Sequence, residues 1–343
     1  MSTIRRRITI GDVAEASGVS RTTVSYVLSG RADVRVPEGT RQRIIEASER
    51  LGYQRNALAA GFRSGRMNTL GIVAPFSMLV GSSERQADAY YKGLVLACAA
   101  AINDQGFNAL LLSEDSDRQV TLSDLTDRRC DGVILVVKSE TEEFVCAADT
   151  AGLPCVTIGR AVGTWQVHTD NVLGARLAVE HLVGLGHRDL AYLSYTKPMV
   201  PSYLQRQRSF LETTSALGVQ GRTYVWGEIP ALAASVRAGD GPTAVFCYND
   251  ELAITLRDAC EVEGIQIPSD LSIVGFDDTL LAQTIRPRLT TVHSPLSQLA
   301  SEAVRLILAQ LSGEPPLPQP LYVQPWLVER DSTAAPRQKD SLR

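Results

Sequence analysis

The chain has 343 residues and is mildly acidic, with 34 Lys plus Arg, 38 Asp plus Glu and a formal net charge of −4. No apolar stretch reaches the length of a transmembrane helix, and the N-terminus lacks the apolar core and cleavage site of a secretory signal. These features exclude a membrane-spanning protein and predict a cytoplasmic one. Charge is unevenly divided: residues 1–66 have twelve Arg and no Lys against six acidic residues, a balance of +6, whereas residues 67–343 have a balance of −10.

Residues 9–28 predict two short amphipathic helices joined by a glycine turn. Thr9 can cap the first helix, because Asp12 three residues later completes a near capping box, and Gly18 ends this helix. Ser20 is the expected cap of the second helix. The residues expected on the outer face of the second helix are Arg21, Thr22, Ser25 and Tyr26. A helix with such a face suits the major groove of DNA.

A third helix is expected between Pro37 and the terminator Gly52, which completes a compact head. The same periodicity is typical of a three-helix bundle that has no role in nucleic-acid binding. The basic balance of residues 1–66 favours DNA, because neutralised phosphates release counterions. Arg5 to Arg7 fit either a basic arm or a solvated terminus.

Short motifs along the head form one gapless match. They are Asp12-Val13-Ala14, Gly18-Val19-Ser20, Thr23-Val24-Ser25, Val27-Leu28, Thr40-Arg41, Leu51-Gly52-Tyr53 and Asn56-Ala57-Leu58-Ala59. Together they resemble the DNA-binding head of the lactose-repressor (LacI/GalR) family of bacterial transcription regulators. The residues that this resemblance implies at the DNA are Thr9, Ser20, Arg21, Thr22, Thr23, Ser25, Tyr26, Asn56, Ala59 and Phe62.

One position departs from the family pattern. Tyr26 stands where the family usually has Arg after Thr-Val-Ser, so a ring with one hydroxyl replaces a donor fork suited to guanine. Arg21 and Thr22 occupy the positions at which the family varies its base-reading pair, and Arg21 favours guanine. We therefore expect an altered half-site preference.

Residues 55–67 are predicted to be a hinge. Gly61 costs roughly 1 kcal/mol relative to Ala in a helix, so this short segment is a poor helix by itself. The resemblance implies that it becomes helical when paired with a second copy on DNA. Phe62 stands where the family has an apolar wedge, usually Leu, and is expected either to enter the minor groove or to pack on its own body domain.

The rest of the chain predicts an α/β body, because short apolar strands alternate with amphipathic helices. Expected strands begin at residues 70, 108, 132, 154, 189, 243 and 271, and expected helices span 91–103, 174–185, 251–263 and 296–310. Two doubly wound parallel-sheet lobes follow, with strand ends facing a shared cleft. The predicted fold class is thus an all-α helix-turn-helix head plus an α/β periplasmic-binding-protein-like core.

The body also resembles the periplasmic-binding-protein-like core of the same family. Matching motifs are Asp170-Asn171, Gly174-Ala175-Arg176, Leu185-Gly186-His187-Arg188, Asn249-Asp250, Val274-Gly275-Phe276-Asp277-Asp278, Leu289-Thr290-Thr291-Val292 and Leu327-Val328-Glu329-Arg330-Asp331-Ser332. We expect a head at 1–54, the hinge, a core at 68–332 and a polar tail at 333–343. Within the core the expected lobes are 68–165 and 166–290, with crossings near 165, 290 and 320.

Four polar residues are predicted to bind an effector in the cleft, by resemblance. They are Asp170, Arg206, Asn249 and Asp277, whose hydrogen-bonding groups suit hydroxyl-rich ligands such as sugars. The alternatives are helix capping for Asp170 and Asn249, turn formation for Asp277 and surface charge for Arg206.

The aromatic floor of the family's cleft is missing or moved, because residues 76–92 lack its Asn-Pro-Phe-Phe-like stretch. Phe76 and Trp165 are the predicted effector-binding aromatics, with Tyr90 and Tyr91 as further candidates; all four also fit core positions. The ligand class therefore stays open between a sugar, a phosphorylated or non-sugar metabolite, and no ligand.

The sequence does not predict an enzyme, a cofactor or a metal site. It has no dinucleotide-binding, phosphate-loop, nucleophile-elbow or zinc-protease motif, and its four histidines lack metal-ligand spacing. Six cysteines without a Cys-x-x-Cys pair fit buried, reduced thiols.

The predicted function is that of a transcriptional regulator, specifically a repressor, that binds a pseudo-palindromic operator as a homodimer under effector control. The expected partners are operator DNA, a small-molecule effector and a second copy of the chain, without a membrane. The alternatives are an exported-type sugar-binding protein of the same core fold, and a ligand-independent or activating regulator.

Overall fold

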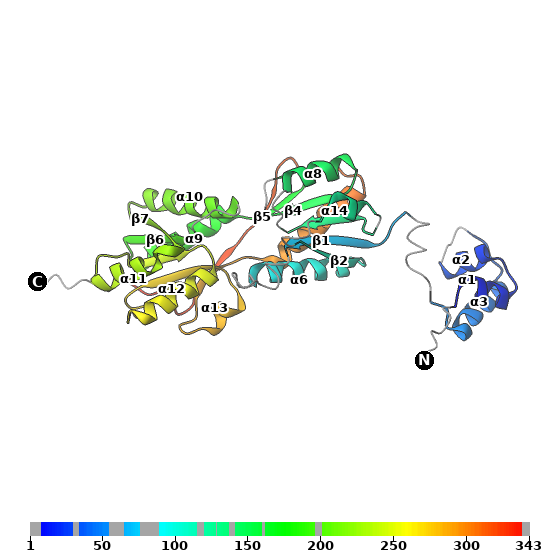
Figure 1. Ribbon diagram of the computed structural model, residues 1–343, viewed down its shortest axis with the longest axis horizontal. Helices are drawn as coiled ribbons and strands as arrows, with labels where there is room; N and C mark the ends of the chain where they lie inside the picture. Colours follow the sequence, from blue (N-terminus) through cyan, green and yellow to red (C-terminus); the bar gives the residue numbers. More distant parts are fainter. Residues whose placement is uncertain are drawn as a thin grey trace, which may run out of the picture. The chain divides into compact units, whose positions relative to one another are not determined.

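A computed structural model describes residues 8–29, 34–54, 65–75, 89–114, 120–127, 129–136, 141–159, 162–195 and 201–337. The chain divides into two compact units, Met1–Met67 and Asn68–Arg343, which we describe separately (Figure 1). The first unit is the head and the second is the body.

The head contains three helices, α1 (Ile10–Ser17), α2 (Arg21–Leu28) and α3 (Glu38–Leu51). The predicted caps are confirmed: Thr9 and Asp12 form a capping box at α1, and Ser20 accepts a hydrogen bond from the Thr23 amide at α2. Gly18 ends α1 in the left-handed conformation, with φ of 66°. A small apolar core, including Val13, holds the three helices together.

The body contains two six-stranded sheets with the same arrangement. The first has the order β11-β5-β4-β3-β1-β2, and the second has the order β12-β10-β9-β8-β6-β7. All pairs are parallel except β10 with β12, which is antiparallel. The predicted doubly wound lobes are therefore confirmed, with one antiparallel edge strand added. In each sheet the order reverses at the first strand of the lobe, which is where such folds bind ligands.

The strands of the first sheet are β1 (Thr69–Pro75), β2 (Asn108–Glu114), β3 (Gly132–Leu135), β4 (Cys155–Ile158), β5 (Gln166–Thr169) and β11 (Leu321–Val323). Those of the second are β6 (Asp189–Ser194), β7 (Gln220–Val225), β8 (Ala244–Cys247), β9 (Ser272–Asp277), β10 (Thr290–His293) and β12 (Trp326–Val328). The helices are α6 (Ala89–Asp104), α7 (Leu122–Thr126), α8 (Thr141–Thr150), α9 (Asn171–Gly184), α10 (Pro201–Ala216), α11 (Ile229–Ala238), α12 (Asp250–Val262), α13 (Leu280–Thr284) and α14 (Leu296–Leu311).

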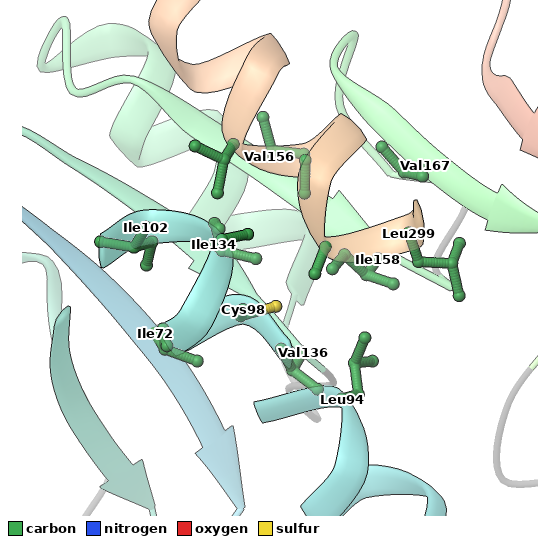
Figure 2. Packing of buried hydrophobic residues seen from close by; sticks show 14 of the residues in the cluster. Ile72, Leu94, Cys98, Ile102, Ile134, Val136, Val156, Ile158, Val167 and Leu299 are labelled. Carbon is green, nitrogen blue, oxygen red and sulfur yellow. The ribbon is translucent and has the colours of Figure 1, made fainter. Parts of the chain in front are cut away.

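Apolar cores lie on both faces of each sheet. On one face of the first sheet, α6 and α14 pack together over strand residues such as Ile134 and Val156 (Figure 2). Leu94 and Cys98 of α6 meet Leu299 of α14 in this core, although about 200 residues separate the two helices. The late helix α14 thus completes the first lobe.

The chain crosses between the lobes after β5, after β10 and between β11 and β12. At the first crossing, strand β5 pairs with the first sheet, and the chain enters the second lobe with α9. Two crossings are in contact, since Thr169 Oγ1 and Ser294 Oγ are 3.2 Å apart. The start of the expected polar tail is attached to the second lobe, where buried His187 lies 2.9 Å from the Ala334 carbonyl oxygen.

Candidate functional site

A narrow cavity lies between the lobes, at the carboxyl ends of the strands. The first lobe contributes Tyr90, Tyr91, Leu94, Ile158, Gly159 and Thr169, and the second contributes Asn171, Ser202, Arg206, Tyr248, Asn249 and Asp277. Its accessible volume is about 40 Å³, enough for one or two water molecules.

Arg206 of α10 is the charged centre of this cavity and is only 5% exposed. Its Nε donates to Asn171 Oδ1 at 2.9 Å, and its Nη1 donates to the Tyr248 carbonyl at 2.5 Å. Its Nη2 lies 3.9 Å from Asp277 Oδ1. The guanidinium carbon is 3.4 Å from the centre of the Phe276 ring. Hydrogen bonds and ring contacts therefore hold this fork in one orientation, which suits directed recognition of oxygen-rich ligands.

The turn after β9 has a strained backbone. Asp277 and Asp278 have φ of 109° and 59°. A residue other than glycine that is held at such a positive φ costs of order 1–3 kcal/mol. Asp278 is held by Arg330, with Nη2 to Oδ1 at 2.5 Å, and by His293, with Nδ1 to Oδ2 at 2.8 Å. The surrounding contacts thus impose this turn, which presents Asp277 to the cavity.

Asp250 stabilises the same turn from the start of α12. Its side chain is fully buried, its Oδ2 accepts from the Thr279 amide at 2.7 Å, and its Oδ1 accepts from Thr291 Oγ1 at 2.5 Å. Burial raises the pKa of this carboxyl to about 6, against the lowering effect of the two hydrogen bonds. A side chain at position 275 would overlap Asp250, so Gly275 is required for close approach.

The first lobe faces this cluster with two tyrosines at the start of α6. The rings of Tyr90 and Tyr91 meet edge to face with centroids 5.2 Å apart. Burial raises the pKa of Tyr90, and the nearby Asp277 carboxylate raises it further, while Arg206 and Thr169 act in the opposite direction. The Tyr90 phenol therefore stays protonated beside the charged pair of the other lobe.

The sequence-predicted effector residues do not all converge. Arg206, Asn249 and Asp277 line the cavity; Asn249 also caps α12, accepting from the Leu252 amide at 3.0 Å. Asp170 is not among the lining residues; its Oδ1 caps α9 by accepting from the Leu173 amide at 2.9 Å.

The predicted aromatics also differ from the residues that line the cavity. Trp165 packs against the core of the first lobe, away from the lining, and Phe76 lies outside the described residues. Tyr90 and Tyr91, the further candidates from the sequence, lie in the lining instead.

Among the lining residues that were not predicted from the sequence are the two that bind Arg206. Asn171 directly follows the cap Asp170, and Tyr248 directly precedes Asn249. In each case the sequence pointed to the neighbouring residue, because both motifs lie at strand ends. Which of the two side chains reaches the cavity depends on the local backbone.

A second cavity of about 390 Å³ lies at the opposite, amino-terminal ends of the second sheet's strands. Two of its charged residues, Arg237 and Arg337, are already paired with Glu263 and Asp270. It is the larger cavity, but ligands of doubly wound folds bind at carboxyl ends, so we place the candidate site between the lobes.

In the head, α2 presents a polar face. Arg21 and Thr22 are exposed, and Thr23, Ser25 and Tyr26 are partly exposed, whereas Val24 and Val27 are buried. The Thr9 and Ser20 hydroxyls bond within the caps. Three predicted DNA-contacting residues lie outside the described residues: Asn56, Ala59 and Phe62.

Within the described part of the chain, no cluster of three or more His, Cys, Asp or Glu side chains could hold a metal ion. None of the described helices has both the length and the apolarity to span a bilayer. All six cysteines are free thiols, and only Cys146 is exposed.

Both parts of the chain match known protein families. Residues 9–56 match the family described as bacterial regulatory proteins, lacI family, and residues 179–333 match the periplasmic binding protein-like domain. The chain is 30% identical over 350 residues to the HTH-type transcriptional regulator GalR of Salmonella typhimurium, covering 96% of each chain.

Solved structures agree in fold. The lac repressor dimer bound to operator and the anti-inducer ONPF has a TM-score of 0.79 at 23% identity, covering 96% of this chain and 100% of that one. The complex of the transcriptional regulator CelR with cellobiose has a TM-score of 0.65 at 26% identity, covering 95% of this chain and 100% of that one.

A helix-turn-helix head joined to a two-lobed binding core defines a transcriptional regulator with a ligand-binding domain. This chain belongs to the LacI/GalR family of bacterial transcriptional regulators.

Proposed function

We propose that the protein is a homodimeric repressor whose affinity for a pseudo-palindromic operator is controlled by a small polar effector between the lobes. The observation that carries the proposal is the buried Arg206 guanidinium, oriented by Asn171 and Tyr248 beside Asp277 at the carboxyl ends of the second sheet. A site of this kind in a chain with a DNA-binding head links ligand and operator. A regulator that reads operators works in the cytoplasm, and we place this one there.

The effector belongs to the class of sugars and related metabolites. Arg206 and Asp277 offer donors and acceptors to hydroxyl groups, and the protonated Tyr90 faces them from the other lobe. CelR, a related regulator, has been solved in complex with cellobiose, which agrees with this class of effector. Because the cavity is narrow, binding changes the separation of the lobes, and this change is the proposed signal.

Thermal-shift screening of the full chain against sugars and phosphorylated metabolites tests the effector site. A hit should raise the melting temperature of the wild type but not of Arg206→Met, because binding to the native state stabilises it. Adding the hit to an operator-binding assay then gives the direction of the coupling. A hit that stabilises both proteins equally would place the effector elsewhere.

The exposed face of α2 is the proposed DNA-binding surface of the head. The proposed contacts are Thr9, Ser20, Arg21, Thr22, Thr23, Ser25 and Tyr26, together with Asn56, Ala59 and the wedge Phe62. Selection of binding sites from random DNA should yield two half-sites related by symmetry, as expected for a dimer. Tyr26→Arg should change the preferred base at one position of each half-site, and an unchanged preference would contradict this role of Tyr26.

The proposed dimer surface lies along α6 and α13. Leu96 is 71% exposed, and Leu280 and Leu281 are 74% and 51% exposed. Both elements contact α12: the Ala89 amide at the start of α6 donates to Glu251 Oε1 at 3.3 Å, and α13 packs against α12. A two-fold axis would bury this surface against its own copy.

A further inference from the structure

Gly11 is the second residue of α1, and nothing in its backbone requires glycine. The helix is regular there, and φ of Gly11 lies outside the left-handed region. Glycine is among the least favourable residues in a helix, because it loses the most backbone entropy on folding. A glycine at this position therefore needs another reason.

The side chain nearest to this position is that of Arg21, the first residue of α2. A Cβ at position 11 would lie 3.1 Å from Nη2, 3.2 Å from Nε and 3.4 Å from Cζ of Arg21. The guanidinium thus lies over the bare Cα of Gly11. A methyl group would have to displace it by a few tenths of an ångström.

Gly11 and Arg21 lie on the two helices of the helix-turn-helix, which contact different components of DNA. In this motif the start of the second helix reads base edges, while the first helix crosses the backbone. Arg21 is exposed, and its guanidinium has no hydrogen bond or ion pair with any other described residue. Its donors are therefore available to a base edge, and the guanidinium lies against α1 at Gly11.

We propose that Gly11 is a specificity-determining residue of the head, which acts by positioning the Arg21 guanidinium for a guanine edge. The inference rests on the proposed DNA-binding function and adds a residue outside the recognition helix. Bidentate recognition of guanine depends on the placement of two donors, so a small displacement of Arg21 reduces base discrimination before it reduces phosphate binding.

The chain contains a matched control. Gly39 is likewise the second residue of its helix, α3, and a Cβ there would meet no atom within 4 Å. Gly11→Ala and Gly39→Ala therefore bring the same gain in helix propensity, and both should fold, which circular dichroism and melting temperature check. Only Gly11→Ala touches Arg21.

The experiment is selection of binding sites from random DNA with the full-length wild type, Gly11→Ala, Gly39→Ala, Arg21→Ala and Gly11→Ala/Arg21→Ala. In the wild type we expect a guanine preference that is lost in Arg21→Ala. Gly11→Ala should lower this preference about fivefold, at the low end of what one arginine–guanine pair contributes. Gly39→Ala should keep it, and Gly11→Ala should add nothing in the Arg21→Ala background.

The outcomes separate the inference from the function on which it rests. If the wild type selects an operator and Gly11→Ala selects the same bases with the same discrimination, Gly11 has no role in specificity. If Gly11→Ala alters the preference equally with and without Arg21, it acts by another route and the inference is wrong. If the wild type enriches no sequence, the proposed DNA-binding function fails and the inference fails with it.

Discussion

At the scale of single residues, Arg206 shows how a buried charge is oriented. Three of its contacts come from the start of α9, from the residue after β8 and from the end of β9, which meet only in the folded lobe. Arg208, two residues later on the same helix, has an 81% exposed side chain and pairs with Glu212. The two arginines therefore form a matched pair for mutation.

Arg206→Lys should lower the free energy of unfolding by about 1–3 kcal/mol. Lysine has one nitrogen in place of the planar fork, so the Asn171 and Tyr248 oxygens cannot both keep their hydrogen bonds. Arg208→Lys should change it by less than about 0.5 kcal/mol, because exposed ion pairs contribute little. Urea unfolding of the three proteins measures this, and equal stabilities would show that the Arg206 fork is not required.

Asp250 makes stability depend on pH. Burial raises its pKa from the usual 3.8 to about 6, so the folded chain binds this proton more tightly than the unfolded chain. The stability it contributes is complete below about pH 4 and is lost as pH rises through 6. Asn at this position carries no charge at any pH. The unfolding free energy of the wild type minus that of Asp250→Asn therefore isolates the contribution of the carboxyl group.

This difference in unfolding free energy should fall by about 3 kcal/mol between pH 4 and pH 7, as an order of magnitude. Urea unfolding of both proteins at several pH values measures it. Thr291→Val removes a hydrogen bond that favours the charged form and should move the change to higher pH. A difference that stays constant across this range would mean that Asp250 is ionised throughout.

At the scale of elements, helix α9 has two glycines in different surroundings. Gly174 faces the ring of Phe276, on which the Arg206 guanidinium lies, whereas a Cβ at Gly184, the last residue of the helix, would meet no atom within 4 Å. Close packing of α9 on the second sheet therefore depends on Gly174. Periodicity predicted the helix but could not distinguish the two glycines, because the ring comes from another strand.

Gly174→Ala should destabilise the body by about 1–3 kcal/mol, because its methyl group would lie 2.7 Å from a buried ring carbon. Gly184→Ala should be neutral or stabilise by up to about 1 kcal/mol through helix propensity. Thermal and urea unfolding give both values. If both alanines stabilised the protein, the ring would have to move freely, and the packing argument would be wrong.

At the scale of the whole molecule, the exposed leucines of α6 and α13 predict how two copies associate. Leu280→Glu should raise the dimer dissociation constant at least about tenfold, because a charge would be buried at the axis. Val262→Glu is the control, since Val262 is 85% exposed at the far end of α12. Analytical ultracentrifugation distinguishes them, and equal effects would place the dimer surface elsewhere.

The sequence by itself determined the elements and their order. Hydroxyl caps, glycine terminators and apolar periodicity are local, so Thr9, Ser20 and Gly18 could be assigned before any tertiary contact was known. Alternating strands and helices likewise indicated two parallel sheets, because a parallel connection needs a crossover helix. The strands β5, β7, β10, β11 and β12 were not among the predicted apolar runs; three of them lie at sheet edges.

Only the tertiary structure decided which polar residues share a site. Asp170 caps a helix while its neighbour Asn171 orients Arg206, since one residue along a helix start changes the direction of a side chain completely. The strained turn at Asp277 depends on Asp250, His293 and Arg330 from three other segments. Such contacts are long-range in the chain, and no local pattern encodes them.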